Sequence, residues 1–127
     1  MILADSSIWA DHLRFEDPTL TALLDAGQVL MHPFIIGEVA LGYLKQRDMI
    51  LFGLKKMAQA PCASDDEVLH LINSRGLVAS GIGYVDAHLL AAVRLQPGAG
   101  LWTRDKKLHA AAERLGFAAI PNRKALP

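Results

Sequence analysis

The first nine residues, MILADSSIW (residues 1–9), combine a short apolar run with an abrupt change to polar side chains. Residues 2–4 predict a short buried strand that ends at Asp5, the only charged side chain among the first ten residues. Ser6 and Ser7 follow at once, so Asp5 could simply cap a helix that begins there. The alternative is that Asp5 belongs to a functional site, which requires other carboxylates in equally unusual positions.

Length and composition point to one folded domain. The chain has 127 residues, of which 52% are hydrophobic and 20% charged, enough apolar side chains to bury a core. The 13 Lys and Arg residues balance 13 Asp and Glu residues, which argues weakly against a nucleic-acid partner. If bound metal neutralised four of these acids, nine acids would face 13 cations, and that objection would disappear.

Targeting signals and disulfide chemistry are not indicated. No apolar run approaches the roughly 20 residues that span a bilayer, and no basic stretch precedes an apolar one at the start of the chain. We therefore expect a cytoplasmic protein without a membrane partner. Cys62 is the only cysteine, so it forms no internal disulfide and lacks the partners for a zinc site. We expect it to be a packed thiol.

Short apolar segments alternate with helical patterns along the chain. The predicted strands are residues 2–4, 29–31, 100–103 and 118–120, and the predicted helices are residues 6–14, 18–25, 33–44, 48–58, 65–75, 83–95 and 104–115. Ser64 and Glu67 predict a capping box at the fifth helix. The alternation is typical of the α/β class with a mostly parallel sheet. Ligands bind beyond the carboxyl ends of such strands, and Asp5 and Asp105 follow strands at these positions.

Two further acids interrupt apolar helices. Glu38 is the only formally charged residue between Asp25 and Lys45, and Asp86 is the only one between Arg75 and Arg94. A helix that is apolar nearly all round is buried, and an isolated carboxylate in a dry interior is very unfavourable unless it is paired or bound to a cation. Each acid has a plain alternative: Glu38 could pair with an arginine, Asp86 could begin its helix, and Asp105 could be a first-turn acid.

The combination of Asp5, Glu38, Asp86 and Asp105 matters more than any one of them. If they converge at one edge of the sheet, mutual repulsion raises some of their pKa values until a cation compensates the charge. Hard oxygen ligands without cysteine favour Mg²⁺ or Mn²⁺ over zinc. An open acidic site of this kind suits phosphoryl chemistry.

Four segments in this order resemble the PIN domain, most closely the VapC-type ribonuclease toxins of bacterial type II toxin–antitoxin systems. They are MILADSSIW, IGEVALG, YVDAHLLAA and LWTRDKKLHAAAERLG. The resemblance implies a single PIN-like domain over residues 1–127, folded as a three-layer α/β/α sandwich with a central, mostly parallel sheet. It makes Asp5, Glu38, Asp86 and Asp105 the catalytic, metal-binding acids. Ser7 and Thr103 match hydroxyl residues that support the metal site.

The resemblance also implies an activity and partners. The expected protein is a Mg²⁺- or Mn²⁺-dependent endoribonuclease toxin that cleaves transfer RNA or a ribosomal RNA loop by metal-activated water. A homodimer and a small cognate antitoxin that covers the site are implied as well. Arg104, Lys106 and Lys107 flank Asp105 and either contact RNA phosphates or form a solvated helix face.

Two other functions remain open at this point. The first is a PIN fold without catalysis that serves only for binding. The second is a HAD-like phosphatase, which also places an aspartate after its first strand. Such phosphatases usually carry a second aspartate two residues later, and that position is Ser7 in this chain.

Overall fold

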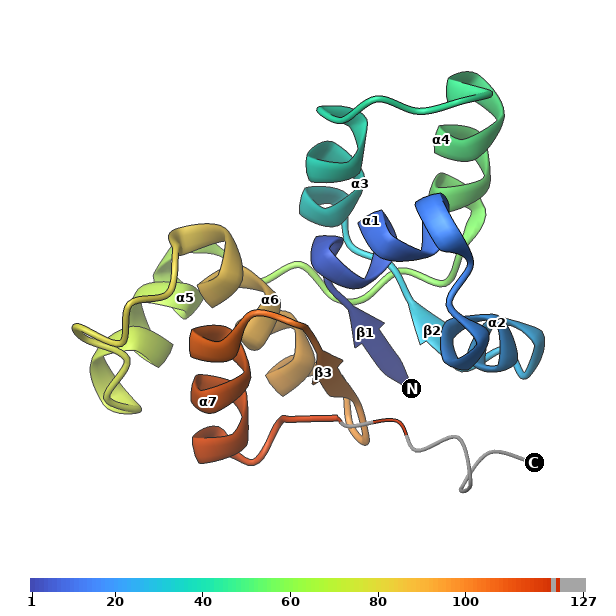
Figure 1. Ribbon diagram of the computed structural model, residues 1–127. Coiled ribbons are helices and arrows are strands. Elements are labelled where there is room, and N and C mark those ends of the chain that lie inside the picture. Colours follow the sequence, from blue (N-terminus) through green and yellow to red (C-terminus); the bar gives the residue numbers. More distant parts are fainter. Residues whose placement is uncertain (120, 122–127) are drawn as a thin grey trace.

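A sheet of three parallel strands lies at the centre of the molecule (Figure 1). The middle strand is β1 (Ile2–Ala4), with β2 (Val29–Leu30) on one side and β3 (Gly100–Trp102) on the other. All three run in the same direction, so their carboxyl ends meet at one edge. Asp5 follows β1 at that edge, as the sequence predicts.

The computed structural model describes residues 1–119 and 121, and this part of the chain contains seven helices. They are α1 (Ser6–Phe15), α2 (Pro18–Asp25), α3 (Pro33–Ala40), α4 (Arg47–Lys56), α5 (Asp65–Ser74), α6 (Tyr84–Leu95) and α7 (Lys106–Leu115). Figure 1 shows α1 to α4 on one side of the sheet and α5 to α7 on the other. The predicted three-layer α/β/α sandwich is therefore confirmed.

Local capping groups explain where several helices begin and end. Asp17 accepts hydrogen bonds from the first backbone amides of α2, and a proline follows it in the first helical position. Ser64 and Glu67 form the predicted capping box of α5. Gly116 ends α7 at φ +80°, a left-handed conformation that favours glycine. These boundaries follow from residues that are adjacent in the sequence.

The last predicted strand is present as a single bridge beside β3. Leu101 pairs with Ala118, its amide donates to the carbonyl of Phe117, and its carbonyl accepts from Ala119. A β-carbon at position 100 would lie 2.8 Å from that of Ala119, so glycine permits this close approach. The prediction for Ile120 lies outside the described residues.

The core is centred on α6. Seven consecutive residues of this helix, from Ala87 to Val93, are buried, and the helix packs against α5 and β3. The expectation that this apolar helix is buried nearly all round is therefore correct. Asp86 and Tyr84 lie at its less buried N-terminal end.

The same expectation is wrong for α3. Only Ile35 and Val39 of this helix are buried, and Glu38 is exposed. The helix packs against α1 and α4 on one face, and the described residues place no layer on its other face (Figure 1). The helix also ends at Ala40, earlier than predicted, and the Arg47 guanidinium donates to the carbonyl oxygens of Ala40 and Gly42 that the helix leaves unpaired.

Two smaller expectations concern surface properties. Cys62 is exposed, so the prediction of a packed thiol is wrong. It lies in the extended connection between α4 and α5, where solvent reaches its side chain. Among the described residues, no helix has the length and apolar character to cross a bilayer.

Candidate functional site

Asp5 occupies the junction between β1 and α1. Its amide donates to the carbonyl of Trp102, which continues the β1–β3 pairing, and its carboxylate caps α1 by accepting from the amides of Ser7 and Ile8. Only 5% of Asp5 is exposed. The helix-cap interpretation and the site interpretation are therefore compatible, since one carboxylate oxygen caps the helix and the other faces β3.

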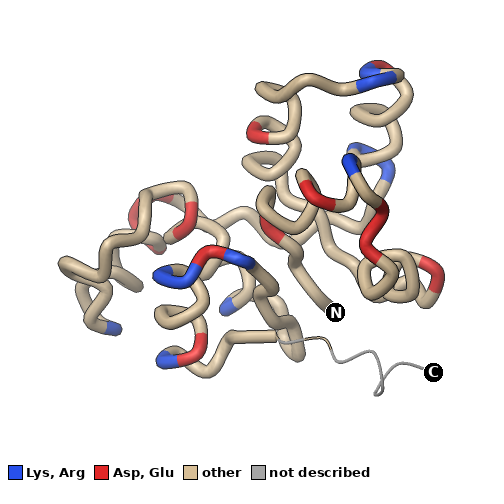
Figure 2. The backbone as a smooth tube through the Cα atoms, in the orientation of Figure 1, with Lys and Arg blue, Asp and Glu red and all other residues tan. Residues whose placement is uncertain are grey.

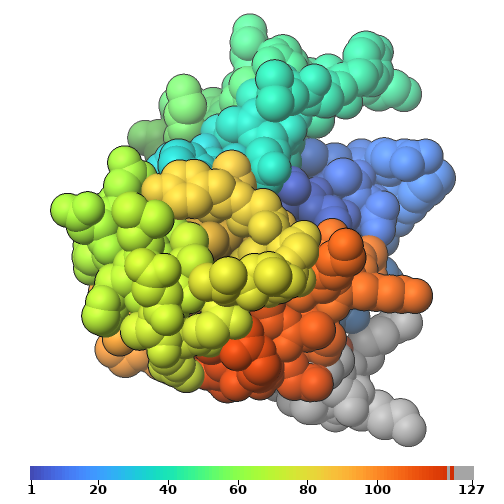
Figure 3. Space-filling model, turned by 90° about the vertical axis from the view of Figure 1, so that its left-hand side faces the viewer, coloured from blue at the N-terminus to red at the C-terminus, as the bar shows by residue number. Residues whose placement is uncertain are grey.

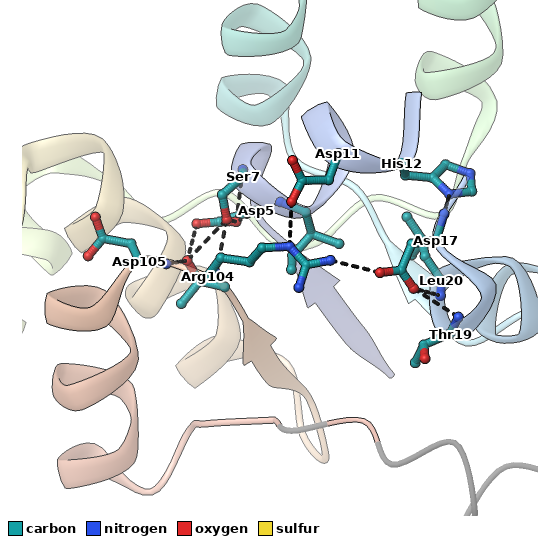
Figure 4. A network of polar contacts seen from close by, with 11 residues as sticks. Asp5, Ser7, Asp11, His12, Asp17, Thr19, Leu20, Arg104 and Asp105 are labelled. Atoms are coloured by element: carbon teal, nitrogen blue, oxygen red, sulfur yellow. Dashed lines mark hydrogen bonds and ion pairs between the residues drawn. The ribbon is translucent and has the colours of Figure 1, made fainter. Parts of the chain in front are cut away.

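Two hydroxyl groups fix the carboxylate of Asp5 (Figure 4). Ser7 Oγ donates to Asp5 Oδ1 and Thr103 Oγ1 donates to Asp5 Oδ2, each at 2.5 Å. Thr103 Oγ1 in turn accepts from the amide of Asp105 at 3.0 Å, and Ser7 Oγ accepts from the amide of Arg104 at the same distance. The turn after β3 is thus joined to the turn after β1 by side-chain hydrogen bonds.

Asp105 lies on the exposed side of this network. Its Oδ1 accepts from the amide of Leu108 at 2.8 Å and so caps α7. No direct hydrogen bond joins the carboxylates of Asp5 and Asp105 in the described part of the chain. Thr103 connects the two residues, because its hydroxyl donates to Asp5 and accepts from the amide of Asp105. Asp105 is therefore the N-cap of α7 and not a first-turn acid, and the cap uses only one of its two carboxylate oxygens.

The pKa of Asp86 responds to the charges of the other three acids. It is half-buried in the first turn of α6. Burial raises the pKa of its carboxyl group, against the opposing effect of a backbone hydrogen bond at Gly83. The negative charges of Asp5, Asp105 and Glu38 raise the same pKa further. The fold thus gathers the other three predicted acids near enough to Asp86 for their charges to act on it.

These acids carry uncompensated charge. Within residues 1–119 and 121, none of the four forms an ion pair with Lys or Arg. In the same part of the chain, no three His, Cys, Asp or Glu side chains are arranged closely enough to hold a metal ion. Oxygen donors with unbalanced charge fit Mg²⁺ or Mn²⁺ in kind. The carboxylates would have to move closer together to share one ion, and exposed Glu38 has the room to do so.

Basic residues lie on both sides of Asp105 at the start of α7 (Figure 2). Lys106 and Lys107 are exposed in its first turn. Arg104 is engaged differently, because its guanidinium pairs with Asp11 at 2.6 Å and with Asp17 at 2.7 Å. Sequence reasoning missed both partners, since nothing local links position 104 to positions 11 and 17.

Sequence reasoning also missed an aromatic bridge between α3 and α6. Edge-to-face contacts connect His32 to Phe34, Phe34 to His88, and His88 to Tyr84, with ring centroids 4.6 to 5.1 Å apart. Tyr84 and His88 both reach Asp65 at the start of α5. The bridge ties the helix that carries Glu38 to the helix that carries Asp86.

His32 is neutral within this bridge. Burial lowers the pKa of its imidazole, and His88 lowers it further. Its Nδ1 accepts from the amide of Phe34 and caps α3, so we place its proton on Nε2. His32 Nε2 has no hydrogen-bond partner among the described residues. Its function here is to begin the helix and to pack against Phe34.

A largely apolar groove of about 870 Å³ adjoins the acids. It lies between α1 and the segment from α3 to the start of α4, and Figure 3 shows the surface hollowed between these blue and teal segments. Ser7 and Glu38 belong both to the acidic site and to the lining of this groove. Arg14 and Lys45 are its basic residues. Leu41 and Tyr43, at the tip of the α3 segment, are 90% and 89% exposed.

Comparison with known proteins adds the following findings. No protein-family model matches the chain. The chain is 48% identical over 118 residues to Ribonuclease VapC32 of Mycobacterium tuberculosis, in strains CDC 1551 / Oshkosh and ATCC 25618 / H37Rv, covering 93% of this chain and 95% of each relative. The crystal structure of PAE2754 from Pyrobaculum aerophilum superimposes with a TM-score of 0.59 at 19% identity, covering 89% of this chain and 80% of that one. This second likeness concerns the fold alone.

Proposed function

Since the chain belongs to the VapC-type family of PIN-domain ribonucleases, we propose that it is a Mg²⁺- or Mn²⁺-dependent endoribonuclease toxin. The substrate class we propose is a structured RNA, such as transfer RNA or a ribosomal RNA loop. A small cognate antitoxin inhibits the enzyme by covering its acidic edge. A HAD-like phosphatase fits the chain less well, because Ser7 stands where the second aspartate of such an enzyme belongs.

The observation that carries this proposal is that four acids from distant parts of the chain lie near one another with no Lys or Arg partner among the described residues. The raised pKa of Asp86 agrees with it, since burial is the main cause and Asp5, Asp105 and Glu38 add unfavourable negative charge. Such an arrangement is unfavourable in an empty site and becomes favourable when a divalent cation compensates the charge. We therefore assign Asp5, Glu38, Asp86 and Asp105 as the residues that would hold the ion.

The bound ion would supply activation of water and neutralisation of charge on the phosphate oxygens. The residues of the chain prepare the site for it. Ser7 and Thr103 donate to opposite oxygens of Asp5 and so hold its carboxylate in one orientation. Lys106 and Lys107 are exposed beside Asp105 and are free to contact RNA phosphates.

The groove supports the antitoxin part of the proposal. A peptide bound between α1 and the α3 segment would lie against Ser7 and Glu38 and would keep RNA from the acids. Its apolar walls suit apolar side chains, and Arg14 and Lys45 suit acidic ones. We also propose a homodimer, because Met49 and Phe52 on α4 are 60% and 63% exposed. Sedimentation of the purified chain, before and after Phe52→Ser, tests this last point.

The nuclease proposal is tested with the chain purified free of any partner. Labelled transfer RNA and ribosomal RNA fragments are incubated with Mg²⁺, with Mn²⁺ and with EDTA. We expect cleavage with either metal, none with EDTA, and products with 5′-phosphate ends. Asp5→Asn and Asp86→Asn should abolish cleavage, whereas Asp66→Asn, at an exposed acid in the first turn of α5, should not.

Two outcomes would contradict the proposal. Cleavage that survives EDTA and both substitutions would exclude the metal mechanism. A clean protein that cuts no RNA but binds a small partner protein would favour the binding module, in agreement with the open spacing of the acids within the described residues.

A further inference from the structure

The side chain of Arg104 runs beside α1 and reaches two carboxylates, that of Asp11 midway along α1 and that of Asp17 at the start of α2 (Figure 4). Its Nε lies 2.6 Å from Asp11 Oδ2, and its Nη2 lies 2.7 Å from Asp17 Oδ2. The guanidinium also lies over the Trp102 ring, 5.9 Å from its centroid. A planar guanidinium with several donors can hold two acceptors at once, which an ammonium group cannot do with the same geometry.

The backbone of the same residue is held as firmly as its side chain. The amide of Arg104 donates to Ser7 Oγ at 3.0 Å. Its neighbours Thr103 and Asp105 are the two residues that link β3 and α7 to the acidic site. Position 104 is therefore attached to the first turn of α1 by its backbone, and to the middle of α1 and the start of α2 by its side chain.

We propose that Arg104 is a positioning residue, which clamps the turn from Thr103 to Asp105 against α1 through Asp11 and Asp17. Only its effect on metal binding and cleavage rests on the function proposed above. In this arrangement the two aspartates take the Nε donor and one Nη2 donor of Arg104 and neutralise its charge, which weakens the attraction of the guanidinium for an RNA phosphate. Lys106 and Lys107 remain as the exposed cations at this end of the site.

The state of Asp17 agrees with a persistent clamp. Its Oδ1 accepts from the amides of Thr19 and Leu20, while its Oδ2 pairs with Arg104. Burial would raise the pKa of Asp17, but the hydrogen bond from Leu20, that from Arg104 and that from Thr19 outweigh it and lower the pKa. One carboxylate thus caps α2 and anchors the arginine. Exposed ion pairs contribute little singly, whereas here one guanidinium joins two carboxylates, and the amides of Thr19 and Leu20 already hold one of them, Asp17, in place.

Three variants separate a clamp from a phosphate contact. Arg104→Met keeps the length of the side chain and removes both ion pairs. The double variant Asp11→Asn with Asp17→Asn removes the anionic partners but keeps Arg104, and asparagine preserves the cap of α2. The third variant combines all three substitutions. Arg104→Lys keeps the charge without the two-armed geometry and serves as the conservative comparison.

The first readout is amide hydrogen exchange without metal or RNA. If Arg104 is a clamp, Arg104→Met and the double variant each speed exchange at positions 104, 105 and 108 by about 10-fold or more. Exchange in the combined variant is no faster than in Arg104→Met or in the double variant alone, because these two variants remove the same interaction. Exchange at Val68 and Leu71 in α5 stays unchanged and reports global stability.

The second readout is cleavage and RNA binding. A clamp lowers kcat with KM nearly unchanged, and it weakens Mn²⁺ binding by about 10-fold in both Arg104→Met and the double variant. RNA binding is measured in an Asp86→Asn background, in which no cleavage is expected. The salt dependence of this binding should be the same with and without Arg104→Met.

The proposal is overturned if Arg104→Met reduces the salt slope of RNA binding by about one while the double variant binds RNA as well as or better than the unmodified chain. It is also overturned if neither variant changes exchange at positions 104, 105 and 108. A chain that cuts no RNA would contradict the nuclease proposal and leave the exchange result to decide the clamp.

Discussion

Thr103 Oγ1 lies 2.5 Å from Asp5 Oδ2, although 98 residues separate them in the sequence. The contact is possible because β1 and β3 are neighbouring parallel strands whose ends coincide. It places a buried hydroxyl between the acid that follows β1 and the acid that caps α7. Replacing the Thr103 hydroxyl by an uncharged group therefore removes one partner from the Asp5 carboxylate and one from the Asp105 amide without altering the charge of the site.

Thr103→Val should destabilise the protein and weaken metal binding. The substitution keeps the shape of the side chain but leaves Asp5 Oδ2 and the amide of Asp105 without their partner. We expect the free energy of unfolding in urea to fall by about 1–3 kcal/mol, and Mn²⁺ affinity to fall by about 10- to 100-fold. Thr103→Ser retains the hydroxyl and should keep most of the free energy of unfolding and most of the Mn²⁺ affinity. Equal effects of the two variants would mean that packing, not the hydrogen bond, matters.

Asp86→Asn should make the metal-free protein more stable at neutral pH while it abolishes cleavage. Burial and the neighbouring acids raise the folded-state pKa of Asp86 above 3.8, its ordinary value. The ionised group therefore opposes folding at any pH above the folded-state pKa, and this penalty disappears as the pH falls towards 3.8. In EDTA, the melting temperature of Asp86→Asn should exceed that of the unmodified protein at pH 7 and equal it near pH 4. An Asp86→Asn protein less stable at pH 7 would contradict this electrostatic account.

Divalent metal should stabilise the protein through the same acids. An ion that binds only the folded state adds about 2.7 kcal/mol at 100 times its Kd, which raises the melting temperature by several degrees. We expect this rise with MnCl₂ in the unmodified protein and in Asp66→Asn, and its loss in Asp86→Asn. A similar rise in all three proteins would indicate binding outside the acidic edge.

Phe34→Ala should loosen α3 from α6. The Phe34 ring makes edge contacts with both His32 and His88, although 40% of Phe34 is exposed. Loss of the two contacts and of the buried ring area should lower the free energy of unfolding by about 1–3 kcal/mol. Phe15→Ala is the matched control, since Phe15 is 77% exposed at the end of α1. Its expected effect is below about 0.5 kcal/mol, and chemical denaturation of both variants measures the difference.

The helices that sequence analysis placed most accurately are those with strong local signals. α2 begins at Pro18 and ends at Asp25 as predicted, because an aspartate cap and a proline act on adjacent residues. The prediction for α3 extended too far, and the carbonyl of Ala40 at its end is satisfied by Arg47, seven residues further along the chain. Boundaries that depend on distant side chains carry no local signal.

The sequence by itself determined the α/β class, the strand that ends at Asp5 and the four acids as candidates, because periodicity, caps and isolated charges are local properties. Only the tertiary structure decided that Arg104 binds Asp11 and Asp17, that one face of α3 is exposed and that the pKa of Asp86 is raised by burial and by three other acids. Each of these depends on distances between residues far apart in the chain. Such distances are set by how the layers pack against the sheet, and no short stretch of sequence contains them.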